Sequence, residues 1–256
     1  MSKFVKLGFG LLSYNIFLVA FLYAIGFTGE VIVPKAINDG ALVGVLEATV
    51  VNLALLTLFA VQHSVMARPA FKRWWTRLIP EAVERSTFVL LASSALALLF
   101  WQWRPMPNLV WGTDSTVAVA VFQSLFWSGW ALVLISTFLI SHFELFGVRQ
   151  VLADWTGRTL PSPVFKTPFL YRFVRHPIYL GFLLAFWATP SMSVGHLLFA
   201  VVTTAYILVG IQLEEHDLLQ LFGKAYASYR QRTGMLLPML WITGSRVQPR
   251  ERRARG

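Results

Sequence analysis

The sequence contains no cysteine and few charged residues. Cysteine is absent from all 256 residues, which excludes disulfides, thiolate-bound metals and a cysteine nucleophile. Charged residues make up only 13% of the chain, too few for the surface of a soluble domain of this size. Instead, 56% of the residues are hydrophobic, and the mean hydropathy is +0.61. We therefore predict a polytopic integral membrane protein.

Six apolar segments can be distinguished, and together they predict an all-α bundle of five to six membrane segments. The first four reach or approach the ~20 residues that cross a bilayer. The fifth is short, and Pro190 with its polar neighbours separates it from the sixth. We expect these last two to form a C-terminal helical hairpin, of which one half crosses the membrane only partly. The segments are Val5–Phe27, Ala41–His63, Thr87–Trp103, Thr116–Ile140, Ile178–Ala188 and Val194–Leu213.

The positive charges predict the orientation of the chain. If six segments alternate across the membrane, 20 of the 22 Lys and Arg residues lie on one side, and only Lys35 and Arg104 lie on the other. The positive-inside rule then places both termini and the longer basic loops in the cytoplasm. Contact with anionic lipid headgroups accounts for the net charge of +10, so we predict a lipid bilayer as partner and no nucleic acid.

No linker or internal repeat divides the chain. Residues 1–240 are therefore predicted to form one membrane domain, and residues 241–256 a basic, disordered tail. No small-residue cleavage site follows the first apolar segment, so no signal peptide is predicted.

A polar motif opens the fifth segment. Proline is favoured in the first turn of a helix, so Pro177 is expected to begin it. Arg175 and His176 then lie at its positive N-terminal end, where a carboxylate or phosphate can bind. Tyr179 offers an aromatic face and a hydroxyl, and Gly181 permits close approach of a ligand or a helix. The alternative is that Arg175 and His176 are ordinary cytoplasmic anchors.

A second polar motif ends the sixth segment on the same side of the membrane. Glu214, Glu215 and Asp217 follow an apolar helix, where negative charge opposes the helix dipole. We interpret this placement as favouring a partner such as a cation, an amine or ribose hydroxyls. A solvated helix end is the alternative, above all for Asp217.

Residues 218–230 have the pattern of an amphipathic helix at the cytoplasmic membrane surface. Apolar and aromatic side chains recur there at spacings of three to four. Tyr226 and Tyr229 lie on one face of this helix and are candidates for the wall of a pocket. Anchoring of the helix to the core or the membrane interface is the alternative.

In order and spacing, these motifs resemble the C-terminal half of the isoprenylcysteine carboxyl methyltransferase-like superfamily, which includes phospholipid methyltransferases. The pattern is Arg-His-Pro-x-Tyr-x-Gly, an apolar hairpin, Glu-Glu-x-x-Leu and Phe-Gly-x-x-Tyr-x-x-Tyr-Arg. The resemblance implies a membrane methyltransferase that binds S-adenosylmethionine (SAM) within residues 174–232. The matching positions are Arg175, His176, Pro177, Tyr179, Gly181, Glu214, Glu215, Tyr226, Tyr229 and Arg230.

The N-terminal half is similar to that of bacterial methanethiol S-methyltransferases. Gln62-His63-Ser64 at the end of the second segment and Ser141-His142-Phe143-Glu144 after the fourth are among the motifs that carry this similarity, which extends over about residues 10–238. It implies methylation of a small volatile thiol, methanethiol, to dimethyl sulfide in the bacterial inner membrane. S-adenosylhomocysteine is the expected second product.

Such a reaction needs a deprotonated thiol, because the thiolate is the nucleophile and a free thiol is mostly protonated at pH 7. His63 and His142 are the candidate bases, and Glu144 lies close to His142 in the sequence. A structural hydrogen-bonding role is the alternative for each histidine. No metal site is predicted. The arginines that could stabilise a thiolate are Arg85, Arg149 and Arg172.

Other functions remain open at this point. The same class of enzyme could act on another small thiol or sulfide, an isoprenylcysteine or a phospholipid. A transporter typically has ionisable residues within the membrane or an inverted repeat. This sequence has almost no ionisable residues in the middle of its apolar segments, since Glu47 lies near a segment end, and no visible inverted repeat. A purely structural membrane subunit would not need charged motifs on both sides of the hairpin.

Overall fold

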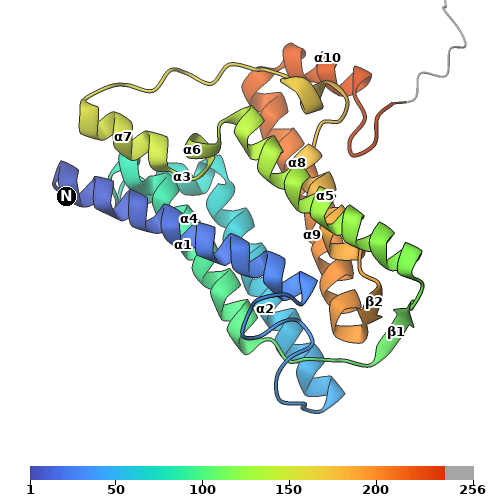
Figure 1. Cartoon of the computed structure of the whole chain (residues 1–256). Coiled ribbons are helices and arrows are strands. Elements are labelled where there is room, and N and C mark those ends of the chain that lie inside the picture. The colour runs from blue at the N-terminus through green and yellow to red at the C-terminus, as the bar shows by residue number, and fades with distance from the viewer. Residues whose placement is uncertain (240–256) are drawn as a thin grey trace, which may run out of the picture.

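The computed structural model describes residues 1–239, which form a bundle of helices (Figure 1). Within these residues, five helices are long and apolar enough to cross a membrane, which confirms the predicted polytopic helical fold. The predicted tail of residues 241–256 lies outside the described residues. The five helices are α1 (Lys3–Gly29), α2 (Val45–Ala67), α4 (Glu81–Gln102), α5 (Thr116–Ile140) and α9 (Val194–Phe222).

The fifth apolar segment forms a short helix followed by a strand. Helix α8 (Pro177–Trp187) has 11 residues, so it is about 16 Å long and covers roughly half of a ~30 Å hydrocarbon core. The chain then continues into β2 (Ser191–Ser193), which pairs antiparallel with β1 (Leu109–Gly112) between α4 and α5. The segment from α8 to β2 therefore joins one end of the bundle to the other. This short two-stranded pairing was not among the predictions from the sequence.

The two ends of the bundle differ in what they carry (Figure 1). The connection between α1 and α2 lies at one end together with β1 and β2. Short helices gather at the opposite end, in the loops that hold most of the basic residues. They are α3 (Pro69–Trp75), α6 (His142–Leu145), α7 (Val148–Thr156), the 3₁₀ helix η1 (Phe169–Arg172) and α10 (Lys224–Arg232).

The amphipathic helix predicted over residues 218–230 is divided between two elements. Residues Leu218–Phe222 continue α9, and α10 begins only at Lys224. Gly223 separates them with φ of 52° and ψ of −125°, a conformation that a side chain disfavours. The break turns α10 so that both Tyr226 and Tyr229 are buried. The prediction of one continuous helix was therefore wrong.

Helices α5 and α8 cross in close contact because each has a glycine at the crossing. A methyl group on Gly181 would lie 2.7 Å from the carbonyl oxygen of Gly129 and 2.9 Å from the amide nitrogen of Val133. Both distances are too short for real atoms, so only a residue without a side chain fits there. The close approach predicted for Gly181 is thus made by a helix, as is common between small residues in membrane proteins.

Candidate active site

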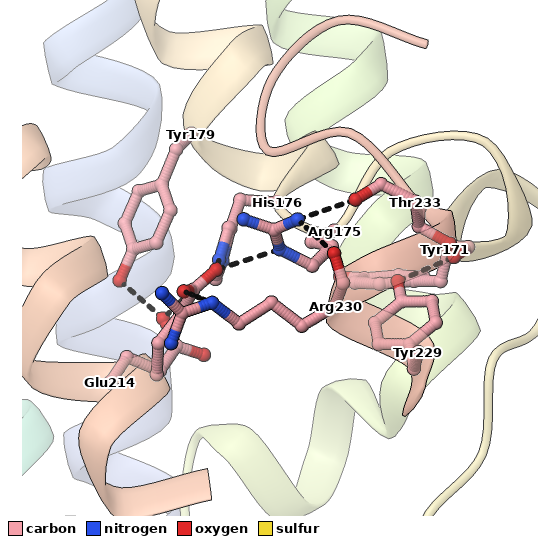
Figure 2. A network of polar contacts seen from close by, with 9 residues as sticks. Tyr171, Arg175, His176, Tyr179, Glu214, Tyr229, Arg230 and Thr233 are labelled. Carbon is pink, nitrogen blue, oxygen red and sulfur yellow. Dashed lines mark hydrogen bonds and ion pairs between the residues drawn. The ribbon is translucent and has the colours of Figure 1, made fainter. Parts of the chain in front are cut away.

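The structure brings the two polar motifs together (Figure 2). Pro177 is the first residue of α8, as predicted, so Arg175 and His176 lie immediately before the helix. Glu214 and Glu215 lie near the end of α9. Because α8 and α9 form the arms of the C-terminal hairpin, the motifs meet at the end of the bundle where the short helices gather.

Three nitrogen-containing side chains contact the carboxylate of Glu215. Arg175 Nε donates to Glu215 Oε1 at 2.7 Å, and His176 Nε2 lies 3.1 Å from the same oxygen. Arg230 Nε lies 3.3 Å from Oε2. Glu215 is only 3% exposed, and a buried charge of this kind is stable only with such partners. Arg175 also donates to the carbonyl oxygens of Arg230 and Thr233, which ties α8 to α10.

This network determines which charged groups stay accessible. The sequence predicts an anion beside Arg175 and His176, but in the structure the Glu215 carboxylate takes that place. The side chain of Glu214 is 43% exposed and that of Arg230 is 48% exposed. One accessible carboxylate and one partly accessible guanidinium therefore border the buried Glu215 carboxylate.

Glu214 is held by a tyrosine and borders an open groove. Tyr179 donates its hydroxyl to Glu214 Oε2 at 2.9 Å, so the residue predicted to offer a hydroxyl does so to the predicted acid (Figure 2). The groove has a volume of about 340 Å³, and Pro69 and Asp217 lie along it with Glu214. Asp217 accepts from Arg68 Nη1 at 2.8 Å. The expectation that Asp217 is merely solvated was wrong, because this ion pair joins the ends of α2 and α9.

The two tyrosines of α10 are packed against the ionic network. Burial raises the pKa of Tyr229 to about 12 and also raises the pKa of Tyr226, so both hydroxyls are protonated donors at neutral pH. Tyr229 donates to the carbonyl oxygen of Tyr171 at 2.5 Å. The Tyr226 hydroxyl has no hydrogen-bond partner within the described residues, although Tyr226 is only 2% exposed. An unpartnered buried donor beside charged groups is consistent with a polar ligand.

His63 lies on α2 and faces α9. Its Nδ1 lies 2.8 Å from the hydroxyl of Tyr206, two turns before Glu214. The rings of Phe59 and Phe88 lie 5.5 and 5.0 Å from the imidazole. The guanidinium of Arg85 lies 4.8 Å from the centre of the Phe88 ring. The imidazole is thus held in an aromatic, positively charged setting at the contact between the two halves of the chain.

His142 is held by hydrogen bonds at both ring nitrogens. Its Nδ1 lies 2.8 Å from Thr137 Oγ1, and its Nε2 lies 2.9 Å from the Tyr14 hydroxyl. Because Thr137 donates its proton to the carbonyl of Leu134, it accepts from Nδ1–H, and Nε2 accepts from Tyr14. Burial lowers the pKa of His142, and the ring stacks on Phe138 at 4.2 Å. This arrangement matches the structural alternative for His142.

Glu144 and Arg149 pair with each other at the surface. Arg149 Nη1 lies 2.5 Å from Glu144 Oε2, and both side chains are more than 40% exposed. This ion pair therefore joins α6 to α7. Arg172 is exposed in η1.

Sequence reasoning missed Tyr206 and the role of Arg68. A tyrosine in an apolar helix is not a distinctive signal by itself. The one available signal is its spacing of eight residues from Glu214, which puts the two residues on a related face of α9. Arg68 follows the Gln62-His63-Ser64 motif and had no predicted partner. Both residues make their contacts between α2 and α9, which no local pattern reveals.

Several curated proteins are similar to this chain over most of its length. A protein of Mycobacterium tuberculosis named methanethiol S-methyltransferase is 55% identical over 238 residues, which are 93% of this chain and 98% of that protein. Methanethiol S-methyltransferase 1 of Bradyrhizobium diazoefficiens is 53% identical over 236 residues, 92% of this chain and 83% of that protein. Nurim of Bos taurus is 30% identical over 183 residues, 68% of this chain and 69% of that protein. No family model and no solved structure matches the chain.

Proposed function

Because the chain belongs to the family of methanethiol S-methyltransferases, we propose that it is a membrane enzyme that methylates methanethiol to dimethyl sulfide with SAM as the methyl donor. The observation that carries this proposal is the identity of 55% over 93% of the chain. The membrane helices agree with it, because a small apolar thiol partitions into hydrocarbon.

The described residues fit SAM in charge and hydrogen bonding. The accessible carboxylate of Glu214 suits the ammonium or the ribose hydroxyls, and the accessible guanidinium of Arg230 suits the carboxylate. The unpartnered hydroxyl of Tyr226 is a further donor. SAM supplies a methyl group already activated on a sulfonium, so the protein has to provide orientation and a dry site. In this proposal Arg175 and His176 fix Glu215 and thereby the shape of the site.

The proposed reaction is tested directly by its volatile product. Membranes that contain the protein are given SAM and methanethiol, and dimethyl sulfide is measured in the headspace. Hydrogen sulfide and longer thiols are compared as acceptors, and membranes without the protein serve as the control. Dimethyl sulfide no higher than in the control would contradict the proposal, and methylated lipid in its place would favour a different acceptor.

We further propose that both termini and the SAM site face the cytoplasm of a bacterial inner membrane. Support comes from the basic residues, 20 of 22 of which would lie on one side if six segments alternate, and from the position of Glu214 near the end of α9. The natural absence of cysteine makes a labelling test simple. In intact cells an impermeant thiol reagent should label Asp114→Cys and spare Arg158→Cys; the reverse pattern would contradict this orientation.

Glu214→Ala is expected to raise the dissociation constant of SAM more than about tenfold, because a charge-assisted hydrogen bond is lost. The fold should be little affected, since the side chain is 43% exposed. Calorimetry on purified protein measures the affinity. Glu144→Ala, the same change at another partly exposed glutamate, is the control for stability. Unchanged SAM binding by the Glu214 variant would contradict the assignment.

His63→Ala is expected to lower turnover at least about tenfold, because an imidazole that accepts the thiol proton or stabilises the thiolate contributes at least that much. His142→Ala is expected to act mainly on stability, since both ring nitrogens are bonded within the fold. The pH–rate profiles of the two variants separate these effects. If neither variant loses turnover, the thiol is deprotonated by water or by another group.

A further inference from the structure

We propose that the acceptor thiol binds over Gly210 on α9, between the Tyr179–Glu214 pair and the His63–Tyr206 pair. This inference rests on the proposed function and adds to it the place where the thiol is held.

Gly210 lies in the middle of a row of residues on α9. Tyr206, Gly210 and Glu214 follow one another at intervals of four, about 6 Å per step, so they lie on one side of the helix. Ile207 and Ile211, next to this row, are buried, whereas Tyr206, Gly210 and Glu214 are half-buried, so the row lies at the edge of the buried face of α9. Among residues 1–239, no atom would lie within 4 Å of a Cβ placed on Gly210. The glycine therefore borders open space at the edge of the buried face of α9.

The groups on the two sides of this space are those proposed to bind the methyl donor and those proposed to act on the thiol. On one side Tyr179 donates to Glu214, the proposed donor-binding acid, at 2.9 Å. On the other side Tyr206 contacts His63 at 2.8 Å. Tyr206 and Glu214 lie eight residues apart on α9, about 12 Å along the helix, so the two pairs lie on either side of Gly210. A thiol over Gly210 would be next to both.

The surroundings of His63 suit a small thiol that must ionise. Phe59 and Phe88 pack against the imidazole and provide an apolar wall. Arg85 lies 4.8 Å from the centre of the Phe88 ring, and Arg68, which is paired with Asp217, is a second positively charged residue near His63. Positive charge in a poorly hydrated site stabilises a thiolate, the form that attacks the methyl group. The apolar wall admits the neutral thiol, and the arginines favour its ionisation.

Tyr206 acts in this proposal as a positioning residue. Its hydroxyl is the hydrogen-bond partner of His63 Nδ1, and the two rings meet edge to face at 6.2 Å between centroids. Loss of the hydroxyl would leave the imidazole free to rotate away from the thiol. The affinity for SAM would not depend on this contact.

Gly210→Ala tests the position of the thiol. The added methyl group should occupy the open space and lower kcat/KM for methanethiol about tenfold or more, the scale of one methyl-sized group in a tight site. SAM affinity measured by calorimetry should stay within about twofold. Alanine is a better helix former than glycine, so the helix itself is not weakened. Gly8→Ala on α1, where a Cβ also meets nothing within 4 Å, is the matched control and should leave kcat/KM unchanged.

Unchanged kcat/KM in Gly210→Ala would overturn the inference, as would a tenfold loss of SAM affinity, which would assign the space to the donor. If wild-type membranes make no dimethyl sulfide, the proposed function fails instead. The two failures are thus distinguishable.

Tyr206→Phe is a second test that keeps the ring and the packing. We expect kcat to fall about tenfold, the scale of one hydrogen bond, with SAM affinity unchanged. In the His63→Ala background the same substitution should cause no further loss, whereas a merely structural role would reduce both proteins equally. Tyr23→Phe, which removes a hydroxyl that donates to the Lys35 carbonyl at 3.1 Å, is the control. A loss of kcat in Tyr14→Phe but not in Tyr206→Phe would move the thiol to His142 and overturn the proposal.

Discussion

Glu215→Ala is expected to lower the free energy of unfolding by about 3–5 kcal/mol, because removal of one partner leaves a buried charge uncompensated. Arg175 loses the acceptor for its Nε, and its side chain is only 9% exposed. His176 and Arg230 lose the same carboxylate. SAM binding should be lost as well, since this network joins α8, α9 and α10 around the proposed site.

Thermal unfolding in detergent, followed by tryptophan fluorescence, measures this effect. For a chain of this size, 3–5 kcal/mol corresponds to a fall in Tm of roughly 10 °C. Glu144→Ala removes one partner of the exposed pair with Arg149 and should cost at most about 1 kcal/mol. Equal shifts in the two variants would show that the Glu215 network does not stabilise the fold.

The helical fold was predictable because hydropathy over ~20 residues is a local property. Helix α5 has the predicted bounds, Thr116–Ile140. The strand pairing of Ser191–Ser193 with Leu109–Gly112 was not predictable, because its partners are far apart in the sequence. Local composition carries no sign of such a pairing.

The meeting of the two polar motifs was predictable from the sequence, but the different surroundings of the two glutamates were not. Glu214 and Glu215 are adjacent on a helix and therefore point about 100° apart. Which one is buried depends on α10, whose position follows from the break at Gly223. In the structure Glu215 receives the buried cations, and Glu214 remains accessible. The sequence predicted that the two acids serve one ligand together. The structure instead makes Glu215 a structural acid and leaves Glu214 as the candidate binding acid.

The sequence alone likewise could not distinguish the two candidate catalytic histidines. His63 and His142 both lie near the ends of apolar segments, and the sequence favours neither. The structure distinguishes them by their partners, because Thr137 and Tyr14 occupy both nitrogens of His142. Tyr206 contacts only one nitrogen of His63 among the described residues. The bonds of Tyr14 to His142 and of Tyr206 to His63 join residues more than 100 positions apart, and no local pattern in a single sequence reveals them.

Gly181→Val is expected to destabilise the protein by about 3 kcal/mol, at the upper end of the usual cost of overpacking. A Cβ at this position would meet the Gly129 carbonyl oxygen at 2.7 Å and Val133 Cγ2 at 2.8 Å. The Gly129 oxygen belongs to the backbone of α5, so no side-chain rotation relieves that contact. Helix α8 has to move away from α5 instead. Tyr179 lies two residues earlier on α8, so its bond to Glu214 should be disturbed and SAM affinity should fall together with Tm.

The matched control for this substitution is Gly8→Val on α1, where a Cβ meets no atom within 4 Å. It makes the same chemical change at an exposed position of a helix, so Tm and SAM affinity should both be preserved. Gly129→Ala provides an independent check, because its Cβ would lie 2.6 Å from the Ala185 amide nitrogen on the other side of the same crossing. If Gly181→Val kept the wild-type Tm and SAM affinity, α8 would not be fixed by this contact, and the position of Tyr179 would have to depend on the Glu215 network alone.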